Sequence, residues 1–276
     1  MTTVSLVHRV ARTMGRYAPL SLAETSWDNV GTLLEPPKPR KGNRVLLTID
    51  LSAPVLAEAL ADEQVSAILA YHPAIFRGTK RFSLADHTQR TVLECAAAGI
   101  GIYSPHTALD ACEGGINDWL ARGCGAGTVA PITPADNPPE GQSKAGAGRT
   151  LMLEKPIPLK ELIDRVKKHL QLDHLRLASY HPEKPVQSIA ICAGSGASML
   201  GGVKADVYLT GEMSHHEVLA ALHSDTSVIL CEHSNSERGY LSQVLQPYLQ
   251  KAFDEEGQEL VDVVVSKVDR DPLRVV

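Results

Sequence analysis

The sequence lacks the features of several protein classes. Its five cysteines are odd in number and form no CxxC pair, which argues against a disulfide framework and against a thiolate zinc site. Reduced thiols inside the cell fit this usage best. No apolar run approaches the roughly 20 residues that a membrane-spanning helix needs. The sequence therefore predicts an intracellular protein that does not act at a membrane.

An excess of positive charge is also missing. The formal net charge is −5, and no long basic run occurs. Two short basic clusters, at 38–41 and at Arg77, Lys80 and Arg81, are more typical of solvated loops than of a nucleic-acid interface. Direct binding of DNA or RNA is therefore disfavoured.

The N-terminal 23 residues contain three arginines and no acidic residue, as mitochondrial presequences do. However, Leu6, Val10, Met14 and Tyr17 lie on one stripe of an amphipathic helix, which favours a surface helix of the fold. We therefore expect a cytoplasmic protein, with the nucleus or the mitochondrion as alternatives.

What the sequence does contain is an alternation of strand and helix patterns, which indicates an α/β fold with mostly parallel sheets covered by helices. At 276 residues, with 43% hydrophobic residues, the chain can form a substantial core. A stretch rich in proline and glycine at 131–148 predicts a linker. We therefore expect an N-terminal α/β half at 1–130 and a C-terminal half at 149–276. The predicted strands are 45–49, 66–71, 99–104, 150–154, 175–178, 188–192, 206–209, 227–231 and 260–265, and the predicted helices are 52–62, 88–98, 115–122 and 159–170.

A candidate site follows the predicted strand 227–231. His233 lies just past its carboxyl end, where open α/β sheets place ligands, and Glu237 lies in the first turn of the next predicted helix. An imidazole and a carboxylate at this spacing can reach one cation. The alternative is structural, because Ser234 and Glu237 also have the spacing of a capping box.

Other predicted strand ends carry similar side chains. His72 follows 66–71, Asp110 lies just beyond 99–104, and His215 and His216 follow 206–209. Each has a structural alternative: a hydrogen-bonded buried histidine, a helix cap, or a histidine pair on the first turn of a capped helix. Because strand ends of a parallel sheet converge on one edge, the set also fits a site for Zn²⁺, Fe²⁺ or Mn²⁺.

Several motifs along the chain resemble one known family. They are WDNVGTLL (27–34), YHPAIF (71–76), SPHTALDA (104–111), GGINDWLA (114–121), TGEMSHHE (210–217) and EHSNSERGYL (232–241). Together and in this order they resemble the Nif-three-like family, also called the GTP cyclohydrolase I type 2 family. The tyrosine of YHPAIF and the GEMSHH motif are similar to its eukaryotic branch.

The resemblance implies two intertwined three-layer α/β/α domains, a homo-oligomer that is often a hexamer, and a metal centre with one or two divalent transition metals. The implied ligands are His72, Asp110, His233 and Glu237. The family's first histidine of a His-His pair corresponds here to Tyr71, so this chain departs from the bacterial pattern.

The function implied is metal-assisted hydrolysis of a nucleotide-like substrate, with GTP ring opening as the family's suggested reaction. His215 or His216 is the candidate general acid or base. The alternative is a non-enzymatic interaction protein that binds transcription-related protein partners, with a structural or vestigial metal site. The sequence names neither the metal nor the substrate.

Overall fold

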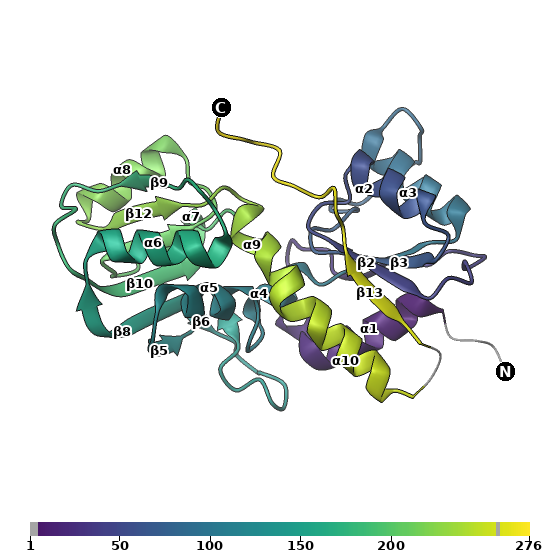
Figure 1. Ribbon diagram of the computed structural model, residues 1–276, viewed down its shortest axis with the longest axis horizontal. Coiled ribbons are helices and arrows are strands. Elements are labelled where there is room, and N and C mark those ends of the chain that lie inside the picture. The colour runs from purple at the N-terminus through teal and green to yellow at the C-terminus, as the bar shows by residue number, and fades with distance from the viewer. Residues whose placement is uncertain (1–4, 258–259) are drawn as a thin grey trace. The chain divides into compact units, whose positions relative to one another are not determined.

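The computed structural model describes residues 5–257 and 260–276, which form two compact units. Unit 1 consists of 1–109 and 240–269, and unit 2 of 110–239 and 270–276. Each unit is therefore built from two separate stretches of the chain (Figure 1).

Unit 1 contains a five-stranded sheet in the order β1-β4-β3-β2-β13. The strands β13, β2, β3 and β4 are parallel to their neighbours, and β1 is antiparallel to β4. Helices α2 and α3 cover one face of this sheet, and α1 and α10 lie on the other face (Figure 1). The strands are β1 (Gly31–Leu34), β2 (Arg44–Thr48), β3 (Val65–Ala70), β4 (Gly101–Ser104) and β13 (Asp262–Val265), and the helical segments are α1 (Leu6–Tyr17), η1 (Leu20–Leu22), α2 (Ala53–Ala61), α3 (His87–Ala98), η2 (Leu241–Leu245) and α10 (Gln246–Glu255).

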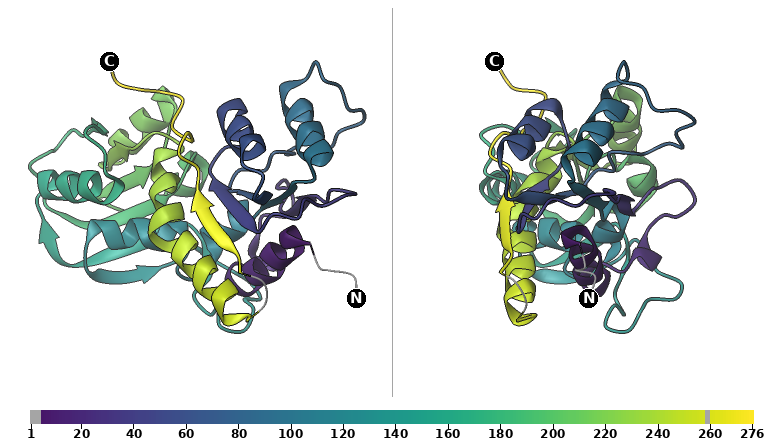
Figure 2. Two further views of the ribbon diagram at one scale, coloured as in Figure 1. Left: turned by 45° about the vertical axis from the view of Figure 1, so that its right-hand side comes forward. Right: turned by 90° about the vertical axis from the view of Figure 1, so that its right-hand side faces the viewer.

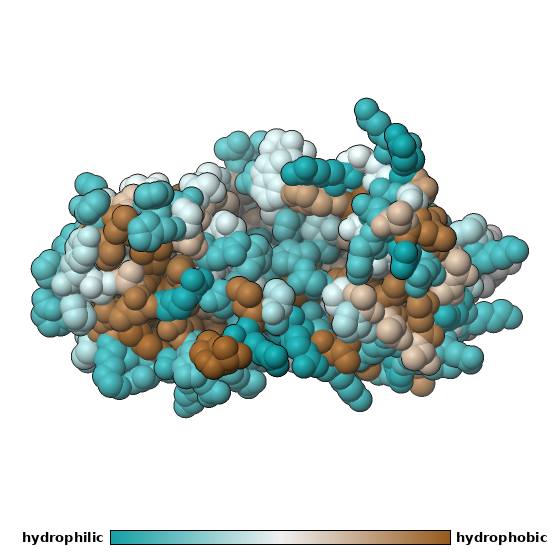
Figure 3. All heavy atoms as spheres, turned by 90° about the horizontal axis from the view of Figure 1, so that it is seen from above, coloured by the Kyte–Doolittle hydropathy of each residue, from teal (hydrophilic) through white to brown (hydrophobic). Residues whose placement is uncertain are grey.

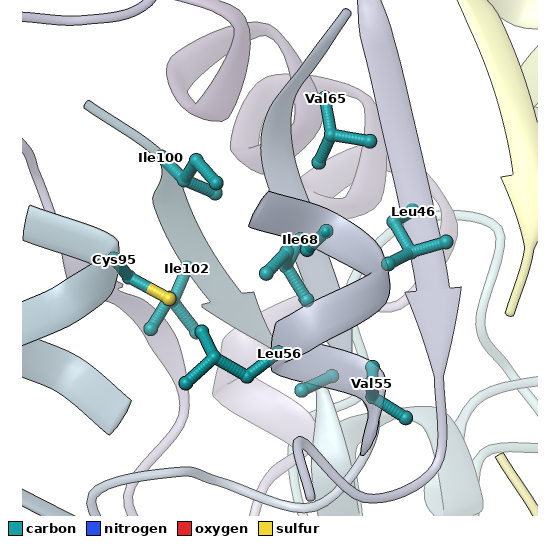
Figure 4. Close-up of a cluster of buried hydrophobic side chains, with 10 residues drawn as sticks. Leu46, Val55, Leu56, Val65, Ile68, Cys95, Ile100 and Ile102 are labelled. Carbon is teal, nitrogen blue, oxygen red and sulfur yellow. The ribbon is translucent and has the colours of Figure 1, made fainter. Parts of the chain in front are cut away.

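Both faces of this sheet are apolar, as the uninterrupted hydrophobic strands predict. Leu46, Ile68 and Ile102 point to one face and pack against Leu56 of α2 and Cys95 of α3 (Figure 4). The alternate residues of the same strands are also buried. Consecutive side chains of a strand point to opposite faces, so the central strands are enclosed on both sides and only their ends reach solvent.

Unit 2 contains a six-stranded sheet in the order β5-β8-β10-β11-β12-β9 and a two-stranded sheet of β6 and β7. Strands β10, β11 and β12 are parallel, whereas β8, β5 and β9 pair antiparallel. The strands are β5 (Gly127–Ala130), β6 (Thr133–Pro134), β7 (Gly146–Ala147), β8 (Arg149–Ile157), β9 (Arg176–Ala178), β10 (Val186–Cys192), β11 (Val207–Thr210) and β12 (Ser227–Leu230), and the helices are α5 (Ile116–Cys124), α6 (Leu159–Leu170), α7 (Ala197–Leu200), α8 (His215–His223) and α9 (Asn235–Tyr240). Helix α4 (His106–Ala111) spans the boundary between the units.

The core of unit 2 again lies on both faces of the parallel strands. Ala190, Tyr208 and Val228 pack with Leu200 of α7 and Ala221 of α8. The alternating strand residues are buried too, and α5, which packs on α6, contacts β8 and β10. The predicted α/β class with helix-covered sheets is therefore confirmed in both units.

The observed division of the chain differs from the predicted halves. Residues 131–148 contain β6 and β7 and belong to unit 2, so they are not a linker between units. The buried Arg149 explains the order of this stretch. Its guanidinium donates to the carbonyls of Gly146 and Gly148, to those of Ala111 and Cys112, and to both oxygens of Asp118. The C-terminal strand β13 also departs from the prediction, since it pairs with β2 of unit 1.

Most predicted elements are present within one to three residues of their expected ends. The strand β1 was not predicted. The short α4 and the edge strand β5 were not predicted either. Their sequences are too short to show a clear period.

Across 5–257 and 260–276, no helix is long and apolar enough to cross a membrane. On the face drawn in Figure 3, hydrophobic residues form separate patches among hydrophilic ones. All five cysteines have thiol side chains, as expected from their number.

Candidate metal centre

In unit 2, His233 and Glu237 lie together after the end of β12. Glu232 adopts a left-handed backbone conformation, with φ of 68°, and this turn separates the strand from α9. The Nε2 atom of His233 then lies 3.6 Å from Oε1 of Glu237, one helical turn later. Glu237 is only 1% exposed. An imidazole nitrogen and a carboxylate oxygen this close together are donor types that Zn²⁺, Fe²⁺ and Mn²⁺ accept.

The other ring nitrogen of His233 is held by a second carboxylate. Nδ1 lies 2.9 Å from Oε1 of Glu212, which follows the neighbouring parallel strand β11. A histidine that donates its Nδ1 hydrogen to a carboxylate presents the lone pair of Nε2 to a metal ion. The local arrangement thus has the form of a carboxylate–histidine–metal triad.

The backbone of Gly194 lies directly beside His233 and Glu237. Gly194 follows β10 with a positive φ of 64°. A Cβ atom there would lie 2.9 Å from Nε2 of His233 and 2.8 Å from Oε1 of Glu237. Its amide donates to Oγ of Ser236. Glycine is therefore required both by the turn and by the close approach to the two candidate ligand atoms.

Asp110 is also part of this region of unit 2. Its carbonyl accepts a hydrogen bond from Asn117, whose side-chain oxygen in turn accepts from the amide of Ala193 beside Gly194. Burial raises the pKa of the Cys192 thiol to about 12, and the negative charges of Asp110 and Glu237 add to the effect. The carboxylates of Asp110 and Glu237 therefore both lie close enough to the Cys192 thiol, at the end of β10, to raise its pKa.

In unit 1, His72 follows β3 and repeats the arrangement seen around His233. Its Nδ1 lies 2.9 Å from Oδ1 of Asp50, which follows the neighbouring parallel strand β2. In each unit, then, a histidine follows one strand of the sheet. A carboxylate that follows the neighbouring parallel strand orients this histidine. His72 also lines a pocket of about 330 Å³ with Asp50, Ser52 and His87.

Aromatic side chains surround His72 within unit 1. The ring of His106 lies 5.5 Å from that of His72 and 5.5 Å from that of the buried Tyr71, measured between centroids. Trp27 lies edge-on to His106 at 6.0 Å. His106 has a φ of 30°, a strained conformation for a non-glycine residue. The motif positions 27, 71, 72 and 106 are therefore gathered at one end of the sheet.

Asp28 holds His106 in this position. Its buried carboxylate lies 2.7 Å from Nδ1 of His106 and accepts from the hydroxyl and the amide of Thr107. Burial alone would raise the pKa of Asp28, but the bonds from His106 and Thr107 outweigh it. The pKa of this carboxyl therefore lies below its usual range.

The two capping-box sequences have different roles. Ser214 and Glu217 form a capping box at the start of α8, with the Ser214 amide 2.7 Å from Oε2 of Glu217. Ser234 instead donates its hydroxyl to Asp271, and the Glu237 carboxylate lies beside His233.

The histidines of α8 occupy the first turn after that capping box. His215 and His216 are exposed, and their rings lie 5.3 Å apart. They follow β11 by the same short loop that carries Glu212. Their predicted role in proton transfer stays a prediction.

Three functional candidates were missed from the sequence: Asp50, Glu212 and Asp28. Asp28 and Glu212 lie within the family motifs, and Asp50 directly follows a predicted strand. These positions are the signals by which the sequence could have identified them. Asp50 and Glu212 follow strands adjacent to those that precede the two histidines, and strand adjacency was not specified by the sequence.

The fold and these residues define a class: an α/β protein of two helix-covered units, each with a carboxylate-oriented histidine at its strand ends. The family model described as Duf34/NIF3 (NGG1p interacting factor 3) matches residues 5–272. The chain therefore belongs to the Duf34/NIF3 family, as its motifs predicted.

Relatives of known sequence place the chain with eukaryotic members. Protein NIF3 homolog of Schizosaccharomyces pombe is 45% identical over 252 residues, covering 90% of both chains. NIF3-like protein 1 of Homo sapiens is 36% identical, covering 94% of this chain and 90% of that one. NGG1-interacting factor 3 of Saccharomyces cerevisiae is 37% identical, covering 99% and 98%. The predicted eukaryotic branch is thus confirmed.

Solved structures show the same fold at lower identity. Staphylococcus aureus hypothetical protein SA1388 superposes with a TM-score of 0.80 at 22% identity, covering 98% of this chain and 99% of that one. Reduced HcgD from Methanocaldococcus jannaschii gives a TM-score of 0.72 at 22% identity, covering 94% and 96%. At this identity the likeness establishes the fold alone.

Proposed function

We propose that the protein is a metal-dependent hydrolase that acts on a nucleotide-like substrate. His72, Asp110, His233 and Glu237 bind one or two divalent transition metals, Zn²⁺, Fe²⁺ or Mn²⁺. Within unit 2, His233 and Glu237 place an imidazole nitrogen and a carboxylate oxygen 3.6 Å apart. The observation that carries the proposal is the orientation of both histidines, each with Nδ1 on a carboxylate.

The residues fit such a metal by their chemistry. Two imidazoles and two carboxylates are a donor set suited to Zn²⁺, Fe²⁺ and Mn²⁺. Gly194 leaves open the space in front of His233 and Glu237 that a side chain would fill.

In the proposed mechanism, the protein orients its ligands and transfers protons. A bound cation supplies Lewis acidity and acidifies a water molecule. Asp50 and Glu212 keep His72 and His233 in the tautomer that presents Nε2. His215 or His216 exchanges a proton with the substrate's leaving group, a role that their exposure to solvent permits.

A non-enzymatic interaction protein is the alternative function. The observation that favours it is the buried Tyr71, which occupies the position of a family metal ligand and lies beside His72. The name of the Saccharomyces cerevisiae relative describes an interaction with NGG1. In that case the metal would be structural or vestigial and protein partners would be the ligands.

Metal analysis of the purified protein tests the proposal. We expect a divalent transition metal in the wild type and loss of most of it in Asp110→Ala and in Glu237→Gln. Glu217→Gln is the matched control, because Glu217 caps α8 and should leave the metal content unchanged. A wild type that stays metal-free after anaerobic purification and metal loading would refute the metal centre. Metal-loaded protein that converts no nucleoside triphosphate would favour the interaction protein.

The family resemblance also leads us to propose a homo-oligomer larger than a dimer, such as a hexamer. Multi-angle light scattering at micromolar concentration should give a mass well above twice the 29.7 kDa of one chain. A mass of one or two chains would contradict this.

A further inference from the structure

The loop between β3 and α3 forms a pocket of its own in unit 1. Residues 75–86, here called the 75–86 loop, extend away from the sheet beyond α3 (Figure 2). The loop and the first turns of α3 line an open pocket of about 630 Å³, with Asp86 as an acidic residue at its helix end. A volume of this size accommodates a small organic molecule.

Three positive charges lie along this pocket. Arg77, Lys80 and Arg81 line it and are exposed. Within 5–257 and 260–276, no ion pair and no hydrogen bond of these three side chains is formed. Other surface cations, such as Lys160 and Lys184, do have carboxylate partners. Three unpaired cations in five residues of a chain with net charge −5 favour an anionic ligand of more than one charge.

Exposed aromatic rings flank the cations. Phe76 is 45% exposed and Phe82 is 58% exposed, and both line the pocket. Trp27 is 53% exposed, and its ring centroid lies 6.1 Å from that of Phe76. Exposed aromatic faces next to basic side chains are the usual platform on which nucleobases stack.

The pocket adjoins the one that holds His72. Phe76 and Thr88 line both cavities. A molecule held by the 75–86 loop can therefore extend past Phe76 towards the imidazole of His72, the metal ligand of the proposed function.

We propose that the 75–86 loop and Trp27 bind the substrate, an aromatic molecule with several negative charges such as a nucleoside triphosphate. The phosphates bind Arg77, Lys80 and Arg81, and the aromatic ring stacks on Phe76 or Trp27. This inference rests on the proposed function in one respect, because it identifies the bound molecule as the substrate of the metal centre. The binding itself is independent of catalysis.

Tryptophan fluorescence of the full chain reports this binding selectively. The chain has two tryptophans, and Trp119 is 2% exposed within unit 2, in contact with His169. Titration with GTP should therefore quench Trp27. Guanosine and inorganic triphosphate should each bind at least tenfold more weakly, because each has only one of the two recognition elements. Trp27→Phe should remove most of the signal while calorimetry still detects binding.

A charge-matched pair of variants tests the role of the loop. Arg77→Gln/Lys80→Gln/Arg81→Gln should weaken GTP binding at least tenfold and keep the metal content of the wild type. The control changes three exposed or half-exposed lysines of unit 2, Lys155, Lys167 and Lys168, to glutamine and so alters the net charge equally. This control should bind GTP as the wild type does.

Several outcomes would overturn the inference. They are unchanged GTP binding in the loop variant, equal weakening in the control, and inorganic triphosphate binding as tightly as GTP. Tighter binding of a single-stranded oligonucleotide than of GTP would assign the loop to nucleic acid instead. The same titrations on chelator-treated protein separate the two proposals. Binding of GTP without any turnover leaves the loop site standing and refutes the hydrolase, whereas a metal-loaded protein that binds no GTP refutes the loop site alone.

Discussion

Removal of the carboxylate behind His233 should weaken metal binding without unfolding the protein. Glu212 lies 2.9 Å from Nδ1 of His233, and its own side chain is not among the proposed ligands. Loss of such an orienting carboxylate typically lowers metal affinity 10- to 100-fold, and each tenfold step corresponds to about 1.4 kcal/mol. The size of the effect depends on how much of the charge is screened.

The Glu212 side chain is 48% exposed, so solvent screens part of its charge. Glu212→Gln keeps a hydrogen-bond acceptor and loses only the charge, and we therefore expect about a 10-fold loss. Glu212→Ala loses both and should approach the 100-fold limit. Competition with a chromophoric chelator measures these affinities, and thermal unfolding of the metal-free proteins should show little difference.

Glu217 supplies the control, since it is also exposed and lies five residues further along the chain. Glu217→Gln alters the capping box of α8 and should leave the metal affinity unchanged. If Glu212→Ala bound metal as tightly as the wild type, the orientation of His233 by Glu212 would have no role in binding. If Glu217→Gln weakened binding equally, the effect would belong to α8 as a whole.

Three further changes test other parts of the structure. Tyr71→His should supply the ligand that this chain lacks, so that isothermal titration changes from one tight and one weak site to two similar sites; two equal tight sites in the wild type would sink this idea. Arg149→Met should lower the free energy of unfolding by about 3–5 kcal/mol in urea denaturation, because it leaves the Asp118 carboxylate and four carbonyls without their buried partner; a loss below about 1 kcal/mol, the range of a surface ion pair, would contradict this. Asp28→Asn should destabilise the protein at neutral pH, because the folded-state pKa of Asp28 is depressed by His106, and the difference from the wild type should shrink as the pH falls below the ordinary value of 3.8; a difference that stays constant with pH would exclude the carboxylate as its cause.

Short-range patterns explain what the sequence predicted well. The apolar runs that became β2, β3 and β12 contain no internal charge, and a polar residue marks each end. His72 and His233 were therefore placed at strand ends from local pattern alone. Asp110 and Glu237 were named from their positions just beyond predicted strands, and the family motifs then supported them as candidate ligands.

The predictions that failed concern contacts between residues that are far apart in the sequence. Nothing in residues 262–265 specifies that β13 pairs with β2, which lies more than two hundred positions earlier. The proline- and glycine-rich stretch at 131–148 has the composition of a linker, and it is ordered by Arg149, a residue outside it. Likewise, Asp50 and Glu212 gain their roles from the strand that becomes their neighbour.

The late arrival of β13 has a consequence for biosynthesis. The main stretch of unit 2, 110–239, is contiguous and complete before the helix α10 and β13 leave the ribosome. Strand β2 lies in the first stretch of unit 1, yet its neighbour β13 is translated only after 110–239. Domains fold as units, and contacts between distant residues form slowly. The sheet of unit 1 is therefore completed only after most of unit 2 has been translated, and until then β2 exposes an unpaired edge for which chaperones and other chains can compete.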